Sequence, residues 1–135
     1  MARYVFVSAL SGVLFVVMDV LINANPLARQ LYAVYRPIAR PSVSAGAGTA
    51  IDLAYGFVLA GIFLLLFRAL PGESGLVKGL SFGVLLWFLR VVMSVASQWM
   101  IIPLSTGAVV YGLAAGLGET LVLGVLYGLA LRARQ

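Results

Sequence analysis

The stretch LVKGLSFGVLLWFLRVVMSVASQWMII, residues 76–102, is a long apolar run that carries Arg90 near its centre and is followed by Pro103. A helix that spans a bilayer needs about 20 predominantly apolar residues, and a proline often marks the end of a helix. Because the stretch meets both conditions, a membrane-spanning helix is predicted over residues 76–102.

Similar apolar runs lie on both sides of this stretch. They cover residues 4–24, 49–70 and 105–131. The first ends at Asn25-Pro26 and the second at Pro71-Gly72, which are residue pairs typical of helix ends and turns. The sequence therefore predicts an all-α protein, a four-transmembrane-helix bundle that forms one integral membrane domain over residues 1–135.

The composition supports a membrane protein and excludes several kinds of chemistry. Hydrophobic residues make up 63% of the chain and charged residues 10%, against about 25% charged in soluble domains. A soluble fold of this size cannot hide so much apolar surface, whereas lipid can surround it. The chain has no cysteine and no histidine, which excludes disulfides, thiolate chemistry, the usual haem ligand and the usual general base. We therefore predict no catalytic residue, no metal site and no cofactor.

The connections between the predicted helices differ in length. Residues 71–75 form a short turn, and the connection to the last helix is also short, so these neighbours are antiparallel. The first two helices are joined by the long outer segment 25–48. Within it, residues 26–35 form either a short helix in the membrane interface, with Tyr32 and Tyr35 at headgroup depth, or a plain surface loop.

Basic residues indicate the orientation in the membrane. The side that holds both chain ends carries Arg3, Arg68, Lys78, Arg132 and Arg134. The other side carries Arg29, Arg36 and Arg40, all in the long segment. Because basic residues are enriched on the cytoplasmic side, this bias predicts a multi-pass protein of the cell inner membrane with both termini in the cytoplasm.

Small residues recur at every fourth position of the last predicted helix. This glycine stripe consists of Gly112, Gly116, Gly124 and Gly128, with Thr120 between them. Residues at this spacing lie along one helix face and let another backbone approach closely. The stripe indicates either tight helix packing inside one bundle or a contact between copies of the chain.

Four ionisable residues lie within the predicted spans: Asp19, Asp52, Arg90 and Glu119. Such a residue at a helix centre costs roughly 2.5–3.5 kcal/mol on insertion scales, so these side chains are expected to face the protein interior and to pair. At a rise of about 1.5 Å per residue, Arg90 and Glu119 reach matching depths on antiparallel neighbours. The sequence therefore predicts an Arg90–Glu119 ion pair, whereas Asp52 either reaches water or caps its helix.

Polar neighbours extend this group at helical spacing. The predicted binding or ion-pair cluster consists of Asp19, Asn23, Asp52, Arg90, Gln98 and Glu119. We expect it to line an outward-open cavity that the aliphatic residues 64–67 close toward the cytoplasm. The alternative is a buried salt bridge that only fixes the register of the helices.

Two pairs of segments resemble each other. Residues 11–14, SGVL, resemble residues 82–85, FGVL, and residues 52–56 can be aligned with residues 120–124. The matches indicate either two related hairpins of the same orientation, as in transporters with parallel repeats, or chance similarity between apolar helices.

Four motifs also resemble a known group of proteins. They are LPG at residues 70–72, VKGLSFGVLLWFL at 77–89, PL at 103–104 and GVLYG at 124–128. Together they are similar to a family of small four-helix bacterial inner-membrane proteins classed as a domain of unknown function. Members often carry a histidine before the Tyr-Gly of helix two and another near the end of helix four, where this chain has Asp52 and Glu119 or Thr120. The resemblance implies a four-helix architecture and a bacterial origin, but no activity.

Two functions fit these features. The first is a non-enzymatic subunit of a membrane assembly, formed with further copies or with other membrane subunits through small-residue helix packing. The alternative is a small transporter or channel for a polar or ionic solute that uses the intramembrane cluster. A third interpretation, an enzyme acting on lipid, needs a cavity open sideways to the bilayer near Asp52 or Arg90. The lipid bilayer is an expected partner. The net charge of +5 is attributed to helix ends, and no nucleic-acid partner is predicted.

Overall fold

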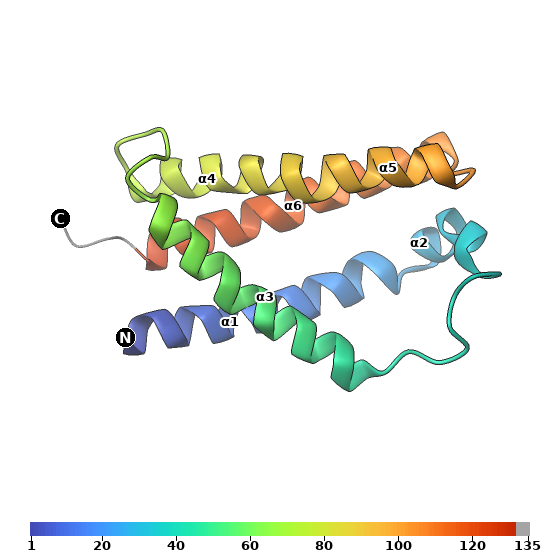
Figure 1. The fold of residues 1–135 in the computed structure, drawn as a ribbon, viewed down its shortest axis with the longest axis horizontal. Coiled ribbons are helices and arrows are strands. Elements are labelled where there is room, and N and C mark those ends of the chain that lie inside the picture. The colour runs from blue at the N-terminus through green and yellow to red at the C-terminus, as the bar shows by residue number, and fades with distance from the viewer. Residues whose placement is uncertain (132–135) are drawn as a thin grey trace.

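The computed structural model describes residues 1–131, and every regular element in that range is a helix (Figure 1). Four helical segments are long and apolar enough to cross a membrane. They are α1 (Ala2–Asn23), α3 (Ala45–Leu66), the continuous segment Gly75–Ile101, and α6 (Thr106–Ala130). The all-helical prediction is confirmed, and the length and composition of these helices are those of a multi-pass membrane protein.

Serine side chains fix where three of the helices begin. In each case the hydroxyl oxygen accepts a hydrogen bond from the backbone N–H three residues later, which satisfies a donor that has no partner in the first turn. The capping residues are Ser44, Ser74 and Ser105. Because of its cap, α3 begins at Ala45 rather than at residue 49, despite the low helix propensity of Gly46 and Gly48.

The end of α3 also differs from the prediction. The helix ends at Leu66, and residues 67–70 form turns and bends instead of a last helical turn. The ammonium group of Lys78 donates hydrogen bonds to the backbone oxygens of Phe67, at 2.7 Å, and Leu70, at 3.0 Å. A cation at this position replaces helical donors for carbonyl groups that the turn leaves unpaired.

The segment Gly75–Ile101 is not uniform. It consists of α4 (Gly75–Leu86), the π-helix η2 (Trp87–Val92) and α5 (Met93–Ile101). In a π-helix each hydrogen bond reaches one residue further than in an α-helix, and such turns are frequent at functional sites. The indole N–H of Trp87 donates to the backbone oxygen of Leu113 on α6, at 2.9 Å, and ties η2 to its neighbour. The helical span predicted over residues 76–102 is therefore present as Gly75–Ile101, with a π-helical middle that the sequence did not indicate.

The spans pack as two antiparallel pairs. α1 packs against α3, and the segment formed by α4, η2 and α5 packs against α6. α1 also contacts α6 and so joins the two pairs. In Figure 1, α3 crosses α1 at an angle, and the N-terminal end of α3 lies away from α5. This arrangement brings polar residues of α1, α5 and α6 toward a common interior.

Glycines allow each pair to approach closely. A Cβ atom added at Gly56 of α3 would lie 2.5 Å from the backbone oxygen of Ser8 on α1. In the other pair, Gly124 of α6 faces Gly79 of α4, and Gly128 follows one turn later, again with backbone directly opposite. Since no side chain fits at these points, the helices are in backbone-to-backbone contact.

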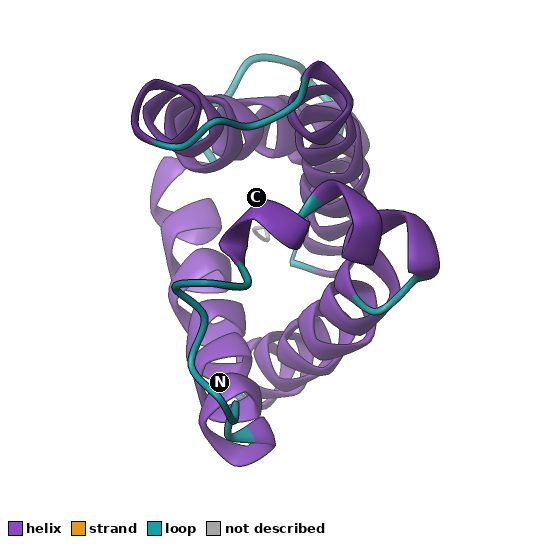
Figure 2. Ribbon diagram, turned by 90° about the vertical axis from the view of Figure 1, so that its right-hand side faces the viewer, coloured by secondary structure: helices purple, strands orange, loops and turns teal. Residues whose placement is uncertain are grey.

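The connection between α1 and α3 contains α2 (Pro26–Leu31) and the 3-10 helix η1 (Ala33–Tyr35). The side-chain oxygen of Asn25 caps α2 by accepting a hydrogen bond from the N–H of Ala28. Ala28 is fully buried, because α2 packs against both α1 and α6. Residues 26–35 thus form helices rather than a plain loop. Figure 2 looks onto the end of the molecule at which α2 lies and shows α2 lying across it.

Candidate functional site

A cavity of about 690 Å³ lies among α1, α3, α5 and α6, at the end where α2 and η1 lie. Its wall combines charged, amide and tyrosine side chains. The polar members that matter below are Asp19, Asn23, Tyr32, Tyr35, Tyr55, Arg90, Ser94, Gln98 and Glu119. Five of the six residues of the predicted cluster therefore meet in one cavity, and Asp52 lies outside its wall.

The predicted ion pair is present. Nη1 of Arg90 on η2 lies 3.5 Å from Oε2 of Glu119 on α6. The side chain of Glu119 is 10% exposed and that of Arg90 is 35% exposed, so the carboxylate is the more enclosed partner. Both residues come from the middle of their spans. The pair therefore forms the deep wall of the cavity rather than its rim.

The guanidinium group of Arg90 also lies against two aromatic rings, one on α1 and one on α3. Its central carbon lies 5.2 Å from the ring centroid of Phe15 on α1 and 5.3 Å from that of Tyr55 on α3. These distances fall within the range of cation–π attraction. Arg90 thus contacts residues of three other helices and connects the two helix pairs.

The other two acidic residues take different positions. Asp19 is exposed to the cavity, and its carboxylate accepts a hydrogen bond of 2.9 Å from the side-chain amide of Asn23. Asp52 is half-buried on α3, about two turns beyond the Ser44 cap, so it does not cap its helix as the sequence allowed.

A chain of polar contacts connects η1 to α5. The hydroxyl of Tyr35 donates a hydrogen bond to Oε1 of Gln98, whose amide group donates to the hydroxyl of Ser94 at 3.2 Å. All three side chains lie in the cavity wall. Burial raises the pKa of the Tyr35 hydroxyl above its usual value, so it remains a hydrogen-bond donor at neutral pH.

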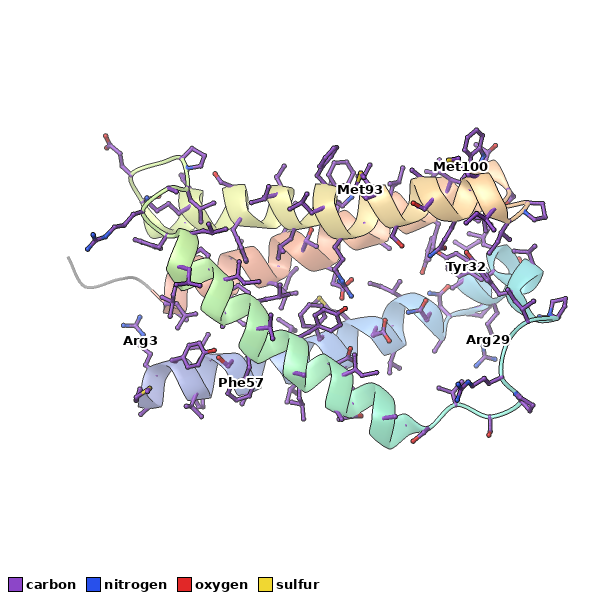
Figure 3. The ribbon with its side chains drawn as sticks, in the orientation of Figure 1. Arg3, Arg29, Tyr32, Phe57, Met93 and Met100 are labelled. Carbon is purple, nitrogen blue, oxygen red and sulfur yellow. The ribbon has the colours of Figure 1, made fainter. Side chains whose placement is uncertain are left out.

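A second group of contacts connects α2 to α1 and α6. The hydroxyl of Tyr111 donates to the backbone oxygen of Ile22 and accepts a hydrogen bond of 2.7 Å from the Asn25 amide. The ring of Tyr32 packs on that of Tyr111 with centroids 6.0 Å apart. Burial raises the pKa of Tyr32, and the neighbouring Tyr111 raises it further. Figure 3 shows Tyr32 at the same end of the molecule as Met100 of α5.

An aromatic cluster, defined here as Phe63, Phe82 and Tyr127, lies beyond the cavity wall. All three are fully buried, and the ring of Phe63 lies 5.3 Å from that of Phe82 and 5.9 Å from that of Tyr127, centroid to centroid. Each lies about two helical turns from a cavity-wall residue of the same span, on the side away from α2. Of residues 64–67, Leu66 and Phe67 pack against the hydrophobic core, whereas Leu65 is 85% exposed, so closure of the cavity by this run stays a prediction.

The glycines of the stripe on α6 lie in two different environments. Gly124 and Gly128 lie against α4, as described above, whereas Gly112 and Gly116 form part of the cavity wall. A Cβ atom at Gly116 would lie 2.5 Å from a methyl carbon of Val91. This face of α6 therefore points toward α4, η2 and the cavity, inside the chain.

The sequence did not indicate two contributors to the site. Tyr55 and Tyr111 lie within apolar runs of the sequence, yet Tyr55 contacts Arg90 and Tyr111 anchors α2. One available signal was the presence of a phenol group well inside an apolar run, since buried tyrosine hydroxyls usually find a hydrogen-bond partner.

No family model matches the chain, and no curated protein or solved structure matches it either. The resemblance to small four-helix bacterial membrane proteins therefore stays a prediction. The fold and the cavity define the chain as a multi-pass helical membrane protein with a charged, tyrosine-lined cavity among its spans.

Proposed function

We propose that this protein binds a polar or ionic solute in the cavity beside Arg90 and Glu119 and passes it across the membrane. The observation that carries the proposal is the meeting of charged and amide side chains from separate spans around one open volume of about 690 Å³. Ligand cavities commonly measure 300–1,000 Å³. Ionisable residues inside a membrane are costly and usually mark a solute or ion pathway.

A purely structural ion pair accounts for less of the geometry. Arg90 and Glu119 satisfy each other across two neighbouring spans and need no open space to do so. Asp19 and Gln98 belong to other hydrogen bonds and nevertheless face the same cavity. A solute site gives a reason for all four to face one volume.

The aromatic cluster suggests how passage is controlled. With Phe63, Phe82 and Tyr127 packed together, the cavity is closed on one side, as expected for one state of an alternating-access cycle. The α1–α3 and α4–α6 pairs are the moving bodies in this proposal. The similarity of residues 11–14 to residues 82–85 supports a common origin of the two hairpins.

We further propose a bacterial inner membrane, with both termini in the cytoplasm and the cavity opening to the other side. Arg3 lies at one end of the molecule and Arg29 at the other (Figure 3). Arg68 and Lys78 follow α3 and begin α4 on the side of Arg3, which supports this orientation. Arg132 and Arg134, which add to the predicted bias, lie outside the described residues.

A second candidate function is a non-enzymatic subunit of a membrane assembly, with another copy or another membrane protein as partner. One observation favours it: an apolar groove of about 200 Å³ between α5 and α6, lined by Val92, Trp99 and Leu113 among others. A side chain of another span fits such a groove. The glycine stripe does not add support, because it is covered within the chain.

The proposal is tested by solute-dependent charge movement in proteoliposomes on a solid-supported membrane, with a panel of amines, amino acids, organic acids and inorganic ions. We expect a current for at least one charged solute, which is lost in Glu119→Gln and retained in Glu73→Gln. Glu73 lies in the turn before α4, outside the cavity wall. If no solute gives a current above that of empty liposomes, or if both variants behave alike, the proposal is overturned.

A further inference from the structure

The charges around the cavity are unbalanced. Arg90 and Glu119 neutralise each other at 3.5 Å. Asp19 faces the same cavity with an amide hydrogen bond but, among residues 1–131, forms no ion pair within 4.0 Å. Asp52 lies outside the cavity wall and does not offset the charge of Asp19. The volume that a solute enters is therefore at negative potential, which favours cations.

An anion has no comparable site. Arg90 is the cationic side chain in the cavity wall, and one of its nitrogens already contacts Glu119. Its guanidinium group also lies over the rings of Phe15 and Tyr55. An anionic solute would have to displace Glu119 and leave that enclosed carboxylate unpaired, which is costly in a low dielectric.

The cavity also differs from a metal-ion site. Within the described residues 1–131, no group of three acidic side chains is arranged to hold a metal ion. The volume of about 690 Å³ is that of a site for an organic molecule. Size and charge together favour an organic cation over an inorganic one.

Tyrosine rings supply the second feature that organic cations require. Tyr32 and Tyr35 lie in the wall with their ring centroids 6.0 Å apart. Tyr55 also lines the cavity and is 41% exposed, so part of its ring is accessible to a solute. Aromatic faces attract ammonium-type cations, most strongly when several surround one charge. They also pack against the apolar groups that such cations carry.

We infer that the cavity accepts an amphipathic organic cation, whose charge lies near Asp19 and whose apolar groups pack among Tyr32, Tyr35 and Tyr55. The inference rests on the proposed function and names the substrate class of the same cavity.

The test is a pair of probes with the same shape and opposite charge. Binding of tetraphenylphosphonium and of tetraphenylborate is measured by titration calorimetry on the purified full chain in phosphatidylcholine nanodiscs, with empty nanodiscs subtracted. We expect saturable binding of tetraphenylphosphonium, and no saturable binding of tetraphenylborate. Asp19→Asn should weaken tetraphenylphosphonium binding about tenfold, the effect of losing one nearby opposite charge.

Two further variants complete the test. Tyr32→Leu should weaken binding about threefold through loss of an aromatic face. Glu73→Gln removes the same charge as Asp19→Asn outside the cavity and should leave affinity unchanged. Equal affinities of Asp19→Asn and Glu73→Gln, or preference for tetraphenylborate, overturn the inference.

The two proposals fail in different ways. If a solute from the panel gives a current but tetraphenylphosphonium neither binds nor reduces that current, the solute class is wrong and the proposed function stands. If no solute gives a current and neither probe binds, both proposals are wrong.

Discussion

The guanidinium group of Arg90 and the carboxylate of Glu119 meet between η2 and α6 with 3.5 Å between Nη1 and Oε2. Arg90 extends from the π-helical part of its span and is the residue at which α1, α3 and α6 come together through Phe15, Tyr55 and Glu119. The contact is both the deep wall of the cavity and a connection between the two helix pairs. Its loss should therefore be measurable in stability as well as in function.

Glu119→Leu leaves the guanidinium of Arg90 without its carboxylate inside the membrane. We expect a loss of about 2 kcal/mol in the free energy of unfolding, between the values for exposed and buried pairs. The double variant Arg90→Leu/Glu119→Leu should lose less than the sum of the two single variants. Reversible unfolding in mixed detergent micelles measures all three. Strict additivity would show that the two side chains do not stabilise each other.

Gly124→Ala and Gly118→Ala form a matched pair on α6. Gly124 faces the backbone of Gly79, whereas a Cβ atom at Gly118 would meet nothing within 4 Å. We expect Gly124→Ala to destabilise the fold by about 1–3 kcal/mol, the usual cost of overpacking. Gly118→Ala should be neutral or slightly stabilising. Thermal unfolding in detergent compares them, and equal melting temperatures would contradict the close contact of α4 and α6.

The absence of cysteine makes labelling a direct test of water access to the cavity. Ser94→Cys places a thiol in the cavity wall, and Ser8→Cys places one at a fully buried position between α1 and α3. A membrane-impermeant methanethiosulfonate reagent should modify the first in proteoliposomes and leave the second unmodified. Mass spectrometry gives the extent of modification, with the cysteine-free protein as the blank. Protection of Ser94→Cys in native lipid would mean that the cavity is not open to water.

The tyrosines beside α2 predict that the packing of α2 and η1 against the spans weakens at alkaline pH. Because burial raises the pKa of Tyr35 above 10.0, the native state favours its neutral hydroxyl. The stability that this hydroxyl contributes is complete below pH 10.0 and declines as the pH rises through its raised native pKa. The protection of the α2 amides, corrected for the base-catalysed rise in intrinsic exchange, should therefore fall as the pH rises through the native pKa of Tyr35 in the unmodified protein. Tyr35→Phe should show the faster exchange already at neutral pH, since it cannot donate to Gln98.

The four spans were predictable because the mean hydropathy of about 20 residues changes little with any single residue. The Arg90–Glu119 pair was predictable for a similar reason. When a short turn joins two antiparallel helices, counting residues from the turn gives the depth of each residue in the membrane. An arginine inside a membrane needs an opposite charge at its own depth. Asp19, Asn23 and Gln98 followed from the same helical spacing.

Other features depend on single hydrogen bonds or on packing that a pattern does not contain. The hydroxyl of Ser44 caps α3, which therefore begins at Ala45. The ammonium group of Lys78 binds the backbone oxygen of Phe67, directly after the helix ends at Leu66. The direction in which Leu65 points depends on how α3 is rotated against α1, which Gly56 decides through backbone contact. The π-helical turn at Trp87–Val92 has no hydropathy signature, because its residues are as apolar as those of the α-helix around it.

That π-helical turn also keeps the two ends of its span in register with each other. A regular α-helix turns by about 100° per residue, and a π turn takes up one more residue within a similar rotation. Removing one residue other than Arg90 from Trp87–Val92 should therefore restore ordinary α-helical geometry and leave Ser94 and Gln98 facing the cavity. The same deletion within α4 or α5 would rotate every later residue of the span by about 100°. A single-residue deletion is thus tolerated at the π turn and nowhere else along this span.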